Sequence, residues 1–172
     1  TALFLALPLA FLLGCSKQSS TTSSSSSTPG TTEVKTSESS TTEKKSELKT
    51  ATFVNDSQPG VVSTLTYTVD GDNVVKQTAH NVADPEVLNN TADAVKSVLE
   101  ETYKGYKGLK GVTFSIEVKD GKVVQDLEID LSVASIDELR KALPEEYSGV
   151  GKNVSFKASK KMLTDLGYTE KN

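Results

Sequence analysis

A stretch of about 32 residues with almost no apolar side chains limits what this chain can fold into. From Ser16 to Glu47 the residues are mainly Ser, Thr, Lys and Glu, and Val34 is the single aliphatic residue. Such a composition buries too little apolar surface to offset the entropy lost on ordering. We therefore expect a flexible tether with a root-mean-square reach of roughly 30 Å, which confines the fold to the residues that follow it.

A short apolar run precedes the tether and ends near the single cysteine of the chain. Residues 2–13 would span roughly 18 Å as a helix, which is too short for a hydrocarbon core of about 30 Å. The run is typical of the hydrophobic region of a signal peptide. Neither an initiator Met nor a positively charged segment precedes it, so we expect that several residues are missing before Thr1.

The tetrad Leu12-Leu13-Gly14-Cys15 resembles the lipobox of bacterial lipoproteins. The resemblance implies that diacylglycerol is attached to the Cys15 thiol and that the signal peptide, residues 1–14, is cleaved off after Gly14. Two acyl chains give stable anchoring in a lipid bilayer, so we expect a protein held at the extracytoplasmic face of the cell membrane. The alternatives are an ordinary signal peptide and a core helix with an incidental cysteine. A lone cysteine also excludes an intramolecular disulfide.

The residues after the tether form one domain, 49–172, which is long enough to bury a core without disulfides or metals. From residue 46 onward there are 15 basic and 20 acidic residues, a net charge of −5 before His80. This balance argues against nucleic acid and against docking on anionic lipid. No cofactor is indicated, and we expect a monomer.

Alternating apolar and polar residues predict two β-hairpins in this domain. Strands at 61–69 and 74–81 flank the turn at 70–73, and strands at 112–119 and 122–131 flank the turn at 120–121. A weaker pattern at 51–54 indicates an edge strand.

Three helices complete the prediction. The first begins at Asp84-Pro85 and continues through Lys104, because apolar residues recur at helical spacing. The second begins at a capping box, Ser135 with Glu138, and stops before Pro144. The third follows Ser155 and ends near Gly167. The order predicts an α+β fold: a two-layer sandwich in which helices cover one face of an antiparallel sheet of about four to five strands.

Two groups of charged residues are candidates for binding. Asp126, Glu128 and Asp130 alternate along a predicted strand and therefore share one face of the sheet, where they could bind a cation. The alternative is a solvated strand face.

The second group lies in a glycine-rich loop. There Lys104, Lys107 and Lys110, together with backbone amides, could hold an anionic group. The alternative is helix termination followed by a mobile loop. Both this loop and residues 149–153 lack the ending of a phosphate-binding P-loop.

No residue pattern predicts catalysis or metal binding. His80 is the single histidine and has no recognisable nucleophile beside it, so we interpret it as a solvated surface residue. Asp70, Asp72 and Asn73 faintly resemble a calcium loop, but the required Gly and the distal Glu are missing. A hairpin turn explains them better.

With the elements laid out, the domain resembles the YehR-like family of small bacterial lipoproteins, whose biochemical role is not established. The likeness lies in four segments: 65–77 (LTYTVDGDNVVKQ), 106–112 (YKGLKGV), 127–130 (LEID) and 162–168 (MLTDLGY). The resemblance implies the fold and the lipid anchor, and it implies no catalytic residue. The long Ser/Thr tether departs from the family pattern and suggests a Gram-positive host.

Three classes of function remain. We expect a non-enzymatic module that binds a partner protein, an envelope polymer or an ion at the cell surface. An accessory solute- or ion-binding lipoprotein linked to transport is the alternative, although a domain of this size lacks the usual two lobes. An envelope hydrolase is disfavoured, because the sequence offers no recognisable nucleophile, base or metal site; a preformed pocket holding two carboxyls with raised pKa would be its structural sign.

Overall fold

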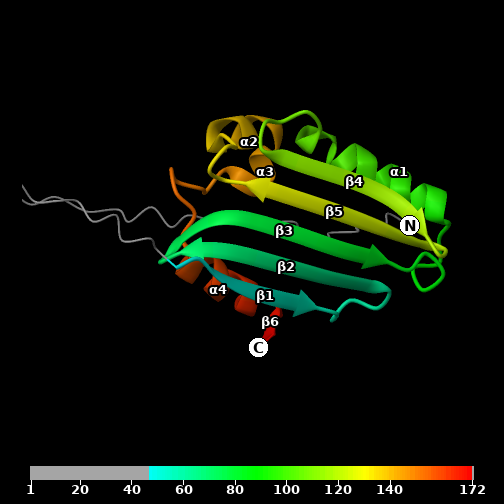
Figure 1. The fold of residues 1–172 in the computed structure, drawn as a ribbon. Coiled ribbons are helices and arrows are strands. Elements are labelled where there is room, and N and C mark those ends of the chain that lie inside the picture. Colours follow the sequence, from blue (N-terminus) through cyan, green and yellow to red (C-terminus); the bar gives the residue numbers. More distant parts are fainter. Residues whose placement is uncertain (1–46, 172) are drawn as a thin grey trace, which may run out of the picture.

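The computed structural model describes residues 47–171. All strands in this range belong to one antiparallel sheet with the order β4-β5-β3-β2-β1-β6 (Figure 1). Consecutive strands pair directly in two hairpins, and β5 joins them by pairing with β3. The strands are β1 (Lys49–Asn55), β2 (Val61–Asp70), β3 (Asn73–Ala83), β4 (Val112–Lys119), β5 (Lys122–Asp130) and β6 (Thr169–Lys171).

The helices lie on one face of the sheet, and the other face is open (Figure 1). Phe156 at the start of α4 packs its ring against Phe53 of β1 and Tyr67 of β2. Near the opposite edge of the sheet, on the same covered face, Tyr103 and Tyr106 pack against Phe114 of β4. The helical elements are α1 (Ala92–Thr102), the 3₁₀ turn η1 (Lys104–Tyr106), α2 (Ile136–Ala142), α3 (Pro144–Tyr147) and α4 (Phe156–Asp165).

This arrangement confirms the predicted α+β sandwich and both hairpins. The described part of the sheet has six strands, slightly more than expected. The weak pattern at 51–54 belongs to a full strand, β1, which pairs with β2 along its whole length. The additional strand is β6, whose three exposed residues pair with Thr52–Val54.

The predicted helix from Asp84 to Lys104 is wrong over its first part. Asp84 accepts hydrogen bonds from the backbone N–H groups of residues 86 and 87, as a helix cap would, but only a turn follows. Asn89 adopts a left-handed conformation with φ +52°, which a continuous helix cannot include. The helix instead begins after Thr91, whose hydroxyl accepts from the backbone N–H of Ala94.

The other predicted helix boundaries are confirmed. Ser135 and Ser155 cap α2 and α4 by accepting backbone N–H bonds from Glu138 and Ala158. Gly167 follows α4 with φ +88°, the left-handed conformation that ends many helices. Pro144 ends the second helix as expected and also begins the one-turn helix α3.

Strand alternation places the core between the sheet and the helices. Inward positions of β2, such as Leu65, Tyr67 and Val69, are at most 4% exposed, whereas the residues between them are partly exposed. None of the described helices is long and apolar enough to cross a membrane.

Candidate functional site

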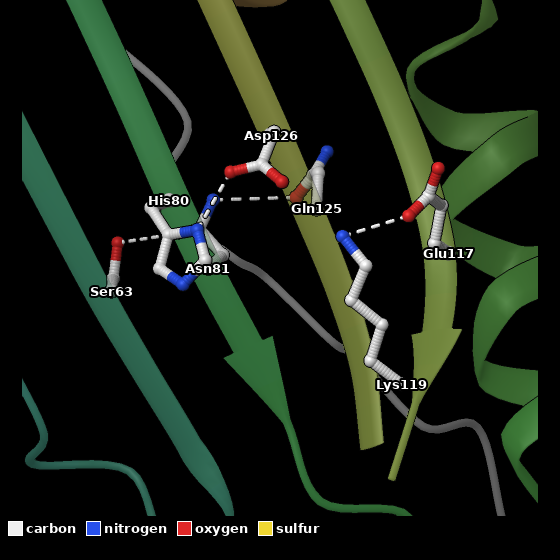
Figure 2. Close-up of polar contacts among 7 residues, drawn as sticks. All are labelled: Ser63, His80, Asn81, Glu117, Lys119, Gln125 and Asp126. Atoms are coloured by element: carbon white, nitrogen blue, oxygen red, sulfur yellow. Dashed lines mark hydrogen bonds and ion pairs between the residues drawn. The ribbon is translucent and has the colours of Figure 1, made fainter. Parts of the chain in front are cut away.

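The predicted acidic face is present on the open side of the sheet, where two of its carboxylates already contact basic side chains. Asp126 Oδ1 lies 2.6 Å from His80 Nδ1 on the neighbouring strand (Figure 2), and Glu128 Oε2 lies 2.9 Å from Lys76 Nζ. Asp130 instead accepts hydrogen bonds from Ser132, and these bonds lower the pKa of its carboxyl. Any cation bound there would compete with these side chains. Among residues 47–171 no cluster of three or more His, Cys, Asp or Glu side chains could hold a metal ion.

A second ion pair extends this face to the edge strand. Lys119 Nζ lies 2.8 Å from Glu117 Oε2 (Figure 2). The hydrogen bond to Glu117 raises the pKa of the Lys119 ammonium, and the nearby Asp126 carboxylate adds to the rise. His80 is thus an exposed member of a charge-balanced surface, as interpreted from the sequence.

The three lysines of the glycine-rich loop are exposed, and two of its glycines lie in close contact with the backbone of a neighbouring segment. Lys104 pairs with Glu101 of α1, and Lys107 and Lys110 follow in the loop. A Cβ at Gly105 would lie 2.7 Å from a backbone oxygen of α2, and one at Gly111 would lie 2.7 Å from the backbone nitrogen of residue 134. Close backbone packing therefore requires these glycines. Anion binding by the three lysines remains a prediction.

Three adjoining depressions form a furrow at one end of the sheet, which we call the end furrow. Their volumes are about 540, 370 and 150 Å³. The smallest depression shares lining residues with both of the others, so the three form one continuous feature. The end furrow is lined by the β2–β3 turn (70–75), the segment after β5 (131–140) and the segment before α4 (151–155).

The end furrow combines an apolar floor with polar side chains that have no partner. Among the described residues, nothing hydrogen-bonds or pairs with the side chains of Asn73, Lys152 or Asn153. Its floor is formed by aliphatic residues of three separate segments: Val74, Leu131, Ile136 and Val154. Amides, an ammonium group and an apolar floor are the mixture typical of sites for polar ligands.

Asp72, Asp137 and Arg140 hold the walls of the end furrow in place, whereas Asp70 lines it without a side-chain partner among the described residues. Asp72 accepts hydrogen bonds from the backbone N–H of Lys157 and from the Ser155 hydroxyl, which lower the pKa of its carboxyl. Arg140 donates to the carbonyl of Val150 at 2.5 Å and to Asp137 at 2.6 Å. These groups shape the furrow and are less available to a ligand.

A second polar cluster lies inside the domain and was not predicted from the sequence. Glu146 Oε2 accepts a hydrogen bond from the Tyr106 hydroxyl at 2.7 Å, and that hydroxyl lies 3.0 Å from the hydroxyl of Tyr147. Burial raises the pKa of Glu146 to about 7, although the Tyr106 hydrogen bond opposes the rise. All five tyrosines of the chain are buried.

A third set of polar side chains crosses the inner face of the sheet. The Tyr168 hydroxyl donates to Ser63 Oγ at 2.9 Å, Ser63 donates to Asn81 Oδ1 at 2.5 Å, and Asn81 Nδ2 donates to Gln125 Oε1 at 3.3 Å. Figure 2 shows Ser63, Asn81 and Gln125 on three neighbouring strands. Their burial could have been predicted from the sequence, because each occupies an inward position of its alternating strand.

The predicted lipidation residue Cys15 and the predicted cleavage residue Gly14 lie outside the described residues. Comparison with known proteins tests the identity of the domain instead. A family model described as "Protein of unknown function (DUF1307)" matches residues 49–169. The chain belongs to this family.

Curated relatives of this DUF1307 chain carry lipoprotein names. It is 39% identical over 116 residues to the "Uncharacterized lipoprotein Lin0239" of Listeria innocua, covering 66% of this chain and 76% of that protein. The "Uncharacterized lipoprotein Lmo0207" of Listeria monocytogenes is 39% identical over 117 residues with the same coverage. These names support the lipoprotein character that the sequence predicted.

A solved structure shares the fold of the DUF1307 domain. The NMR structure of the Escherichia coli YehR protein aligns with a TM-score of 0.59 and 19% identity, covering 73% of this chain and 92% of that one. Together with the family match, it confirms the predicted YehR-like lipoprotein domain of unknown function.

Proposed function

We propose that this protein is a lipid-anchored, non-enzymatic binding protein at the extracytoplasmic face of the cell membrane. The lipobox-like tetrad ending at Cys15 and the lipoprotein names of two relatives support the anchor. Two acyl chains on Cys15 would hold the protein stably in the bilayer.

The end furrow is the proposed ligand site, and an envelope polymer is the proposed ligand. One observation carries this assignment: Asn73, Lys152 and Asn153 line a continuous furrow with an apolar floor and have no side-chain partner among residues 47–171. Amide side chains can both donate to and accept from the hydroxyl and amide groups of a polymer. The Lys152 ammonium suits its anionic groups.

Two observations favour binding over hydrolysis. Two of the three carboxylates that line the end furrow, at positions 72 and 137, are engaged by structural hydrogen bonds, which leaves Asp70 alone. Burial raises the pKa of Glu146, but this carboxyl does not line the end furrow. A hydrolase that uses paired carboxyls would need a second such group beside it.

An NMR titration of the ¹⁵N-labelled full chain tests the ligand site. Soluble muropeptides and poly(glycerol phosphate) are the probes, and chemical shift changes at residues 73, 152 and 153 are the expected result. Lys152→Ala should weaken binding about tenfold, which is the loss of one charged contact. Lys171→Ala, at an exposed lysine that does not line the end furrow, is the matched control and should leave binding unchanged.

Two results would overturn the assignment to the end furrow. One is saturation by neither probe. The other is a set of shift changes centred on residues 104–110 that Lys107→Ala abolishes.

Membrane fractionation tests the anchor separately. Cys15→Ala should abolish membrane retention, because only the thiol accepts the diacylglycerol, and it should leave the far-UV circular dichroism of the domain unchanged. A Cys15→Ala protein that remains in the membrane fraction would contradict the proposed anchor.

A further inference from the structure

Four buried polar atoms on the inner face of the sheet have no hydrogen-bond partner among the described residues. They are Tyr67 Oη, both side-chain polar atoms of Gln77, and Gln125 Nε2. All three side chains are 0% exposed. Tyr67 and Gln77 are paired across β2 and β3, so three of the four atoms belong to neighbouring side chains.

On β3, the inward residues that follow Gln77 are not bulky aliphatic side chains. The inward residues of β3 beyond Gln77 are Ala79, Asn81 and Ala83, which are small or polar. The strand lies between the part of the sheet packed by α4 and the part packed by α1 and η1. The middle strand of the sandwich therefore presents small and polar side chains, between strands that supply aliphatic ones such as Leu65 and Ile129.

Two internal hydrogen-bond chains lie near Tyr67. One chain runs from Glu146 through Tyr106 to Tyr147, and the other begins at Tyr168 and crosses the sheet. Burial, and then the nearby Tyr168 hydroxyl, raises the pKa of Tyr67; Tyr67 in turn adds to the burial-driven rise in the pKa of Tyr147. The Tyr67 hydroxyl thus lies near both chains but is bonded to neither.

We propose that Tyr67 and Gln77 form an internal site that binds a small neutral hydrogen-bonding guest, which we assign as water. The site offers one hydroxyl, one amide donor group and one amide acceptor. Three partners match the two to four hydrogen bonds that a buried water makes. An ion is excluded because no charged side chain bonds either residue, and an unpaired charge is costly to bury.

The substitution Gln77→Met tests the site, because the sign of the change in Tm depends on whether a guest is bound. Met has nearly the volume of Gln and cannot hydrogen-bond the guest. With a guest present, Gln77→Met in the full chain should lower the Tm by about 4 °C, because the guest loses two partners. Gln58→Met, at an exposed glutamine, is the matched control and should change the Tm by less than about 1 °C.

A dry site predicts the opposite sign. Removing unpaired polar atoms from an empty core would raise the Tm of Gln77→Met, and that result would overturn the proposal. Tyr67→Phe, which removes only the hydroxyl, is a milder second variant if Gln77→Met fails to fold. It should also lower the Tm with a guest and raise it without one.

Two direct measurements identify the guest in the full chain. Nuclear Overhauser cross-peaks from water to the Gln77 side-chain amide, absent from Gln77→Met, would confirm bound water. In native mass spectrometry, a fixed added mass that Gln77→Met loses would overturn the assignment to water, because the guest would then be a co-purified small molecule. Finding neither signal would overturn the proposal.

Discussion

The two faces of the sheet use polar residues in different ways. On the open face, His80 contacts Asp126 and Lys76 pairs with Glu128 across neighbouring strands, and these side chains are between 41% and 55% exposed. On the covered face, Asn81 and Gln125 are at most 1% exposed and form a hydrogen-bond chain. Water solvates the exposed charges whether or not they pair, so each pair adds little stability. A buried polar group that loses its partner keeps the full cost of its desolvation. Polar substitutions on the covered face should therefore have much larger effects.

The largest effect is expected for Tyr147→Ala. The ring is 0% exposed and packs edge-on against Tyr106 with centroids 6.4 Å apart. Its removal should lower the free energy of unfolding by about 3–5 kcal/mol, as for other large core side chains. Guanidinium denaturation of the full chain measures the loss. Tyr147→Phe, which keeps the ring, should lose only about 1 kcal/mol, and equal losses in the two variants would contradict the importance of the ring.

The next largest effect is a dependence of stability on pH. Glu146 has a folded pKa of about 7, against an ordinary value of 4.5. Between these values the folded protein keeps a proton that the unfolded chain releases, so the free energy of unfolding should fall as pH rises from 4.5 towards 7. The decrease should be about 3 kcal/mol, and stability should level off above the folded pKa.

Two variants isolate this contribution. Glu146→Gln should flatten the profile of unfolding free energy between pH 4.5 and 8, whereas Glu145→Gln, at the exposed neighbour, should keep the wild-type slope. The carboxyls of Asp72 and Asp130 do not interfere, because their hydrogen bonds to residues 155–157 and 132 lower their pKa values. An unchanged slope in Glu146→Gln would show that another group titrates.

A smaller loss is expected for Asn81→Leu on the covered face. The new side chain is similar in size, but it removes the acceptor for Ser63 and the donor for Gln125. Two buried groups then each lose one hydrogen bond, so the free energy of unfolding should decrease by about 1–3 kcal/mol. Urea denaturation checks this value. An unchanged free energy of unfolding would indicate that the hydrogen bonds of Asn81 make no net contribution to stability.

The smallest effect is expected for a substitution at Asp126, which follows Gln125 in β5 and faces the open side of the sheet. Asp126→Asn breaks the ion pair with His80 and should change the free energy of unfolding by less than about 1 kcal/mol. A loss as large as that of Asn81→Leu, measured by the same urea titration, would remove the contrast between the faces.

Much of the fold could be predicted because local sequence encodes it. Strand alternation in 61–69 and 112–119, the Gly turns and the serine caps at 135 and 155 each depend on neighbouring residues. Strand β6 could not be predicted, because its three exposed residues are held by pairing with β1, more than 100 positions earlier. The turn at 84–91 was mistaken for helix because an Asp-Pro pair begins both structures in the same way.

The candidate site was less predictable for the same reason. The end furrow is formed by three segments that are distant in sequence, and Lys152 was considered only within a segment that fails as a phosphate loop. Glu146 lies in a helix of four residues, which is too short to show a period. Ser63, Gln77 and Gln125 could have been found, since alternation already placed them inward.

The place where the chain enters the fold affects how the end furrow would meet its ligand. Lys49, the first residue of β1, pairs with Val69, next to the turn that lines the end furrow. With the proposed anchor in place, the binding surface and the point of attachment would share one end of the domain. A ligand fixed to the same membrane would then be encountered at an effective concentration set by tether length, in the millimolar range for short flexible linkers. Weak intrinsic affinity would suffice for such a ligand, whereas a freely diffusing one would gain nothing from the arrangement.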